Sequence, residues 1–398
     1  MIAFLISPYA IVAGERHLDM ERAVSVLERC VILGLPFRTN GSGERLFDPV
    51  EVVNGIKHLH FSRGEPIWIE RSVRMLRRLM AEALRGAPHD TPPNLSLLEE
   101  EAYTVTIRRR FSLAGYRNGD IVRLRLPLPL DGFDKVRVLL PSATGIDHRV
   151  LPGRVEVRAT VSDSSDIEIG AEVRFTARPR ALADQPSPTE TEFALWTRPR
   201  EGLIKVDSQI RDLARYISNG VDEPWTVMGR LWDYLFDKYQ LGFLHYDQID
   251  PADPLSAIQR TCRFDCMTGS AFLASLCRAL GLPARLVSGY TLNPVLPTAH
   301  SWCEVWLPGS GWAAFDLYSL DLAGGDRDSP WRHHFFGRLD HRFVSERYPL
   351  EFCGTGSVRL PRAWQLFSCR RDEGAESTYE ALDTGALVLR EIVNVVRG

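Results

Sequence analysis

The stretch of sequence that decides the fold is residues 266–316, which read CMTGSAFLASLCRALGLPARLVSGYTLNPVLPTAHSWCEVWLPGSGWAAFD. The residues after Cys266 are apolar at helical spacing, and Gly281-Leu282-Pro283 is typical of a helix end. Three strands are predicted after this helix, at residues 284–290, 300–307 and 311–316. The last two flank the turn Pro308-Gly309-Ser310-Gly311, so they are expected to pair as a hairpin. The pattern therefore predicts a buried helix beside an antiparallel sheet.

Three side chains of this stretch favour nucleophilic catalysis. Cys266 opens the predicted helix, where the macrodipole and unpaired backbone N–H groups are expected to favour a thiolate and to stabilise an oxyanion. His300 begins one hairpin strand and Asp316 ends the next, so the two are expected to lie close together. A Cys, a His and an Asp in this arrangement suit thiolate chemistry, with His300 taking the proton and Asp316 orienting the imidazole.

These residues resemble the core of the transglutaminase-like superfamily. The matching motifs are Cys266, Arg278-Ala279-Leu280-Gly281-Leu282-Pro283-Ala284-Arg285, Ser288-Gly289-Tyr290, His300-Ser301-Trp302-Cys303-Glu304-Val305, Gly311-Trp312 and Phe315-Asp316. The resemblance implies a papain-like cysteine fold and a Cys266–His300–Asp316 triad that works without a cofactor. Two positions depart from the family pattern, because Phe264 replaces a common Gly and Met267-Thr268-Gly269 replaces an acidic or aromatic pair. The resemblance therefore supports the type of reaction more than it indicates the substrate.

The rest of the chain divides by hydrophobic period. Residues 1–100 are expected to be mainly helical, and residues 101–195 alternate with period two, which predicts a small antiparallel β-sandwich. Residues 183–202 are rich in Pro, Thr and Glu and are expected to form a loop or linker. Residues 203–398 are assigned to the transglutaminase-like catalytic domain. The predicted class is α+β: a papain-like core preceded by the sandwich and the helical region.

Composition excludes several classes of function. The net charge of -3 argues against a nucleic-acid binder, and no apolar run is long enough for a membrane span. The seven cysteines are odd in number, which indicates reduced thiols in a cytoplasm. Of the 48 basic residues only four are Lys, a bias typical of a GC-rich bacterial genome.

Competing interpretations apply to the other candidate residues. Cys262 is a rival nucleophile, but the motif register would then place Arg278 and Gly281 too far along the helix. The Cys262-x3-Cys266 spacing lacks the second ligand pair of a zinc site, and His333, His334 and His341 show no ligand spacing, so no metal is expected. Several other residues are expected to be structural: Cys277, Cys303, Trp302, Trp312 and Arg285. Glu304 is expected to face solvent or to pair with an Arg.

The implied reaction is acyl transfer through a Cys thioester, forming an amide in a step such as peptide natural-product assembly. A cysteine peptidase or amidase is the alternative, and an inactive fold that serves as an interaction module is a third. Residues 66–86 predict a helix with one basic face, formed by Arg71, Arg74, Arg78 and Arg85. That face is either solvated or a docking site for an acidic carrier protein.

Overall fold

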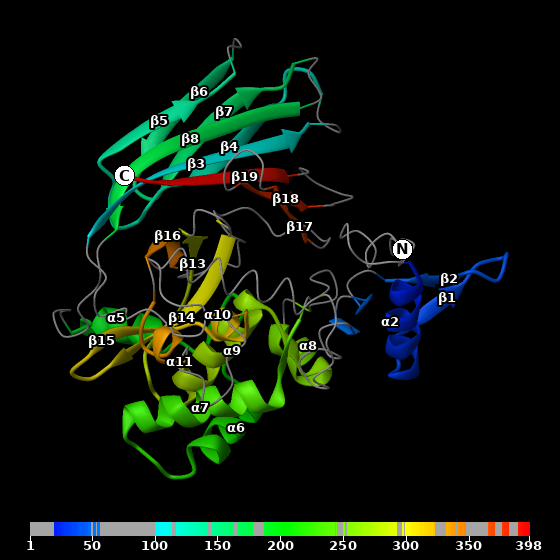
Figure 1. Ribbon diagram of the computed structural model, residues 1–398. Coiled ribbons are helices and arrows are strands. Elements are labelled where there is room, and N and C mark those ends of the chain that lie inside the picture. Colours follow the sequence, from blue (N-terminus) through cyan, green and yellow to red (C-terminus); the bar gives the residue numbers. More distant parts are fainter. Residues whose placement is uncertain are drawn as a thin grey trace.

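The computed structural model describes residues 20–48, 51–52, 54–55, 100–113, 117–141, 145–162, 166–177, 187–242, 244, 250, 253–292, 297, 299–322, 332–339, 341–347, 365–370, 376–381 and 389–398. Helices and antiparallel sheets are both prominent, which confirms the predicted α+β class. Figure 1 shows a β-rich layer at the top, most of the helices in the lower part and a further sheet between them, while the N-terminal helix, in blue, lies apart at the right. None of the helices in the described ranges combines the length and the hydropathy of a membrane span.

The lower half is a four-stranded antiparallel sheet with helices packed on it. The order is β15-β14-β13-β16, with bounds Gly311–Phe315, Ala299–Leu307, Ala284–Thr291 and Arg342–Arg347. The helices are α6 (Ser208–Ser218), α7 (Pro224–Lys238), α8 (Pro254–Thr261), α9 (Cys266–Ala279), α10 (Leu317–Leu322) and α11 (Arg332–Phe335). Two short pairs accompany them, namely β9 (Arg200–Glu201) with β10 (Ile204–Lys205) and β11 (Gln240–Leu241) with β12 (Arg263–Phe264).

Helix α9 is the centre of this half. It contacts β13 and β14 on one side and α6 and α7 on another, and every residue from Met267 to Arg278 is buried. Its approach to β12 needs a glycine, because a Cβ on Gly269 would lie 2.5 Å from the ring of Phe264. The predicted helix of residues 266–280 therefore forms the interior of the domain, where burial of its apolar side chains stabilises the fold.

The upper layer is a β-sandwich of two antiparallel sheets. One sheet has the order β17-β18-β19-β3-β8-β5, with bounds Gln365–Arg370, Glu376–Ala381, Leu389–Arg397, Glu101–Ser112, Asp166–Ala177 and Lys135–Leu139. The other has the order β4-β7-β6, with bounds Ile121–Pro127, Arg154–Thr160 and Ile146–Leu151. The inward side chains of both sheets form one apolar core, as the period-two pattern predicts.

The C-terminal strand belongs to this sandwich in space. The expected catalytic domain of residues 203–398 is not continuous, because β19 pairs with β3 along nearly its whole length. The physical reason is that β3 offers an unpaired edge and β19 supplies alternating inward residues, Glu391, Val393 and Val395. Figure 1 shows this last strand, in red, beside β3. A local sequence pattern contains no information about which distant strand edge will be the partner.

Two expectations for the connecting segments also differ from the structure. The predicted linker of residues 183–202 contains helix α5 (Glu190–Trp196), which begins with a capping box between Thr189 and Glu192. The expected helical N-terminal region contains α2 (Met20–Ile32), but it also contains a hairpin of β1 (Phe37–Thr39) and β2 (Arg45–Phe47). The predicted Arg-faced helix at residues 66–86 lies outside the described residues.

The sandwich and the lower sheet share a core. Tyr290 and Leu292 at the end of β13 and Phe343 on β16 pack among the apolar residues of the sandwich. At Gly289 the strands β13 and β16 approach so closely that a Cβ would collide with the backbone of Phe343, beside a register shift between Ser288 and Gly289. In the Gly289-Tyr290 motif, the glycine thus allows the close contact between β13 and β16, and the tyrosine supplies the buried ring beside it.

A buried ion pair crosses this junction. Arg109 of β3 donates from Nε to Glu391 of β19 at 2.5 Å and from Nη2 to the hydroxyl of Tyr290 at 3.1 Å. Tyr290 in turn donates to the same carboxylate at 3.0 Å. The side chains of Arg109 and Glu391 are only 1% and 5% exposed, so neither charge has access to water. Each partner is therefore required by the other.

We expect Glu391→Gln to lower the free energy of unfolding by about 3–5 kcal/mol, because it leaves the Arg109 charge buried without its counterion. Urea denaturation would measure the loss. The control is Asp166→Asn, which removes the partner of Arg110 on the same strand from a pair that is 53% and 33% exposed. That change is expected to cost at most about 1 kcal/mol. Equal losses for the two variants would contradict the importance of this junction.

Candidate active site

Cys266 is the first residue of α9 and lies close to the backbone of β14. Its preceding residue, Asp265, caps the helix by accepting from the N–H groups of Met267 at 3.1 Å and Thr268 at 2.8 Å. The N–H groups of Ser301 and Met267 donate toward the Cys266 sulfur. Because Ser301 follows His300 in the chain, this contact places the thiol beside the histidine-bearing strand. Cys266, the predicted nucleophile, therefore lies at the start of the helix and in contact with β14.

The electrostatic surroundings of the thiol differ from the expectation. Burial raises the pKa of the Cys266 thiol, the charge of Asp265 raises it further, and the backbone donors of Ser301 and Met267 only partly oppose this. The expectation that the helix start favours a thiolate is therefore wrong for this site. The main reason is burial, which penalises the charged sulfur, and the carboxylate of Asp265 adds to it because it lies in the same N-terminal positive potential that a thiolate would use. The resting group is a thiol, so its reaction requires a base.

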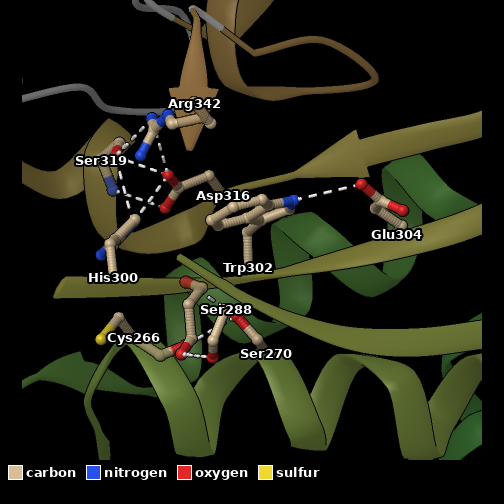
Figure 2. A network of polar contacts seen from close by, with 10 residues as sticks. Cys266, Ser270, Ser288, His300, Trp302, Glu304, Asp316, Ser319 and Arg342 are labelled. Carbon is tan, nitrogen blue, oxygen red and sulfur yellow. Dashed lines mark hydrogen bonds and ion pairs between the residues drawn. The ribbon is translucent and has the colours of Figure 1, made fainter. Parts of the chain in front are cut away.

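His300 and Asp316 form the hydrogen bond that the hairpin geometry predicts. Nε2 of His300 lies 2.8 Å from Oδ2 of Asp316, although Asp316 follows the last paired residue of β15 and lies opposite no residue of β14. Both side chains are almost fully buried. The bond through Nε2 leaves Nδ1 free to serve the thiol. Figure 2 shows the Nδ1 edge turned away from Asp316, toward the side of the network where Cys266 lies.

The Asp316 carboxylate has further donors around it. Ser319 donates to it twice, from its backbone N–H to Oδ1 at 2.9 Å and from its hydroxyl to Oδ2 at 2.5 Å. Arg342 donates from Nη2 to Oδ2 at 3.2 Å (Figure 2). Burial alone would raise the pKa of Asp316, but the charge and hydrogen bond of His300, the charge of Arg342 and the hydrogen bond of Ser319 together lower it to about 2. Asp316 is therefore an anion at every physiological pH.

Neither Ser319 nor Arg342 was expected at the site. Ser319 carries a weak signal, since a Ser three residues after an Asp is compatible with a helix cap at the start of α10. Arg342 carries none, because it is one of many Arg residues and comes from a strand that the local pattern does not link to Asp316. Only the antiparallel pairing of β16 with β13 brings Arg342 to the carboxylate.

Aromatic rings support the histidine. Trp302 stacks on His300 with ring centroids 6.4 Å apart, and Tyr318 contacts it from α10 at 5.3 Å. Trp302 also donates to Glu304 at 3.4 Å. Glu304 is buried and pairs with Arg285 at 2.5 Å, so the second of its two expected environments is the observed one. The Arg285 guanidinium lies 3.8 Å from the Trp312 ring, which makes it part of the packing.

The remaining candidates lie away from this network. Cys262 is exposed and follows α8 with a left-handed backbone at φ 51°. Cys277 and Cys303 are buried. Within the described part of the chain no three His, Cys, Asp or Glu side chains gather as metal ligands. His341 instead contacts the Tyr103 hydroxyl at 3.0 Å in the sandwich.

Comparison with known proteins identifies one family. Residues 211–317 match the model of the transglutaminase-like superfamily. A solved candidate cysteine protease from Cytophaga hutchinsonii is 12% identical, with 75% of this chain and 91% of that chain covered and a TM-score of 0.47. The periplasmic domain of TgpA from Pseudomonas aeruginosa is 17% identical, with coverage of 60% and 92% and a TM-score of 0.32. Red sea bream transglutaminase is 8% identical, with coverage of 74% and 72% and a TM-score of 0.26. No curated protein sequence matches the chain.

The lowered pKa of Asp316 predicts acid sensitivity with a definite sign. The folded state binds this proton less well than the unfolded state, so the stabilisation is complete above about pH 5 and is lost as the pH falls toward 2. We expect the stability advantage of the native protein over Asp316→Asn to shrink by about 2 kcal/mol between pH 5 and pH 2. Denaturant unfolding at both pH values would measure it. Asp131→Asn, which alters an exposed partner of Arg347, serves as control and should keep the native acid dependence.

Proposed function

We propose that this chain, whose residues 211–317 form a transglutaminase-like superfamily domain, is a cysteine acyltransferase that forms amide bonds through a thioester on Cys266. The observation that carries the proposal is the bond between His300 Nε2 and Asp316, which leaves Nδ1 for a thiol at the start of the adjacent helix. The superfamily consists of cysteine-dependent enzymes, which supports an enzymatic role over an inactive interaction module. The proposal includes the cytoplasmic setting that the odd number of cysteines predicts.

The proposed first half-reaction forms the acyl-enzyme. His300 accepts the Cys266 proton as the sulfur attacks the carbonyl carbon of the donor, which gives a tetrahedral oxyanion. When that intermediate collapses, the carbon–leaving group bond breaks and His300 returns the proton to the leaving group. Asp316 stays ionised and stabilises the imidazolium formed between these two steps, without taking the proton itself. The product is a thioester between the acyl group and Cys266.

The second half-reaction transfers the acyl group. An amine attacks the thioester carbonyl while His300 removes a proton from the amine nitrogen, and the carbon–sulfur bond then breaks with return of that proton to Cys266. An amide and the free thiol result. If water replaces the amine, the same steps give a carboxylic acid. The alternative function is therefore a cysteine peptidase or amidase.

The nucleophile can be tested directly. We expect Cys266→Ala to fold and to lose turnover by roughly 10³-fold or more, because the variant lacks the sulfur on which the proposed thioester forms. Cys262→Ala is the matched control, four residues away at an exposed position, and should retain most activity. Peptide mass spectrometry should find iodoacetamide on Cys266 in the native protein, at a rate that His300→Gln lowers. An active Cys266→Ala variant would refute the thioester mechanism.

The type of reaction is read from the products. A small acyl thioester would be offered with and without an added primary amine, and the amide and the acid would be quantified by mass spectrometry. Amide as the main product supports the transferase. Acid alone at saturating amine, together with cleavage of peptide amides, would replace it with the hydrolase.

We also propose that an acidic carrier protein presents the acyl donor, docking on the basic face predicted at Arg71, Arg74, Arg78 and Arg85. Reversing Arg71 and Arg74 to Glu should raise KM for a carrier-bound thioester several-fold and leave a small soluble thioester unaffected. The effect should weaken with salt, because steering between exposed charges is screened. Reversal of Arg108 and Arg158, exposed residues of the sandwich, serves as the control. If the reversal changed KM equally for both substrates, the predicted basic face would be a solvated surface and not a docking site.

A further inference from the structure

Serine hydroxyls lie at the contact between helix α9 and the sheet, close to the nucleophile. They belong to Ser270, Ser288 and Ser301, and all three residues are buried. Ser270 is one turn along α9 from Cys266, whereas Ser288 of β13 and Ser301 of β14 are paired across the two strands. Figure 2 shows Cys266, Ser270 and Ser288 in the lower part of the polar network, with His300 above them. The contact between the start of α9 and the sheet is therefore polar at this point.

The hydroxyl of Ser270 lies between the backbone of the nucleophile and the backbone of the strand that carries the base. Its Oγ donates to the carbonyl oxygen of Cys266 at 2.6 Å, and the carbonyl oxygen of Ser301 lies 3.5 Å from the same Oγ. The N–H of Ser301 donates toward the Cys266 sulfur, and Ser301 directly follows His300 in the chain. One hydroxyl thus spans the two segments whose separation decides how the sulfur meets the imidazole.

Further hydroxyls hold the strand side of this contact. Oγ of Ser288 and Oγ of Ser301 are 2.5 Å apart, and Ser345 of β16 donates from its hydroxyl to the carbonyl oxygen of Ser288 at 3.1 Å. These side-chain bonds add to the backbone pairing of β14 with β13 and of β13 with β16. Ser270 therefore ties the start of α9 to a strand that is itself fixed in the sheet.

The serine brings no advantage to the helix itself. A Ser that donates to the carbonyl four residues earlier slightly destabilises a helix and often bends it, and Ala has the higher helix propensity. A buried hydroxyl is also costly unless it is hydrogen-bonded. A residue that departs from the local preference beside a reactive group is expected to serve the site.

We propose that Ser270 is a positioning residue, whose hydroxyl fixes the start of α9 against β14 and so sets the approach of the Cys266 sulfur to His300. This inference rests on the proposed function and adds a residue to it. Ser270 acts through the backbone of Cys266. A misplacement of reacting groups by about 1 Å can cost roughly 10²-fold in rate, so a smaller shift of the helix start is already measurable.

The test compares two serines of the same helix. Ser270→Ala removes the contact beside Cys266. Ser275→Ala is the matched control, because Ser275 is buried and also donates to the carbonyl four residues earlier, that of Ala271, at 2.8 Å. Ser275 additionally accepts from the N–H of Lys205 at 3.1 Å, so its loss should lower stability at least as much. Urea denaturation measures the stability of both variants.

The measured quantity is the burst of thiol released from a small acyl thioester. The burst gives the maximal rate constant of acylation and the donor concentration at half-maximal rate, and acylation precedes the choice between amine and water. We expect Ser270→Ala to lower the maximal rate constant about tenfold and to change the half-maximal concentration less than about twofold. Ser275→Ala should keep the native rate constant.

Two further measurements accompany the burst. Iodoacetamide alkylation of Cys266, which needs no thioester, should also slow in Ser270→Ala and stay native in Ser275→Ala. Ser270→Thr restores a hydroxyl that can reach the same carbonyl, and it should recover most of the lost rate. If the added methyl group prevents folding of the Thr variant, the comparison of the two Ala variants decides.

The outcomes separate this inference from the proposed function. A slow Ser270→Ala with a native-like Ser275→Ala supports the role of Ser270. A native rate in Ser270→Ala overturns that role, as does an equal rate loss in Ser275→Ala or a folded Ser270→Thr that is as slow as Ser270→Ala. In each of these cases the proposed function stands, provided that Cys266→Ala is inactive. If Cys266→Ala is still acylated with a native burst, the proposed function fails and the role of Ser270 fails with it.

Discussion

The buried carboxylate of Asp316 requires hydrogen-bond donors from several elements, and this requirement constrains how those elements pack around the site. Asp316 is 1% exposed, and an ion of this kind cannot stay in a protein interior without partners that replace its water. Its donors come from three different elements: β14 gives His300, α10 gives Ser319 and β16 gives Arg342. The end of β15, the start of α10 and the edge strand β16 therefore have to converge. The same residue also ties the backbone to α11, because its N–H donates to Phe335 at 2.9 Å.

The charge on Asp316 and the protonated thiol at Cys266 have a common physical origin in burial. Burial raises the pKa of both groups, but only Asp316 is surrounded by enough positive charge and hydrogen-bond donors to overcome it. At Cys266 the N–H groups of Met267 and Ser301 act in the same direction on the sulfur, but burial and the charge of the capping residue Asp265 outweigh them. The site thus holds its negative charge on the orienting residue and its proton on the nucleophile. In such a site His300 acts as the base only when the sulfur attacks. The imidazolium that forms is then stabilised by the Asp316 carboxylate, which is already ionised.

The β-sandwich is part of the environment of the site and more than an appended module. It packs on the ends of β13 and β16 through Tyr290, Leu292 and Phe343, and a buried Arg109–Glu391 pair joins it to Tyr290. His341 contacts the sandwich while the next residue, Arg342, contacts Asp316. A movement of the upper layer would therefore act on the strand that supplies one of the donors to the carboxylate.

The sequence by itself determined the helix that begins at Cys266, the hairpin, and the bond between His300 and Asp316. These depend on residues within about fifty positions of one another, and periodicity, a turn and antiparallel pairing are local properties. Tertiary structure alone decided what surrounds them. Arg278 belongs to the family motif, but its partner is Glu201 from the short strand β9, and Arg342 and Glu391 reach their partners only through strand pairings across long separations. The protonation preference of Cys266 was also beyond the sequence, because the macrodipole can be inferred from a helix start, whereas the competition between burial, the Asp265 cap and the Ser301 donor depends on distances set by the folded chain.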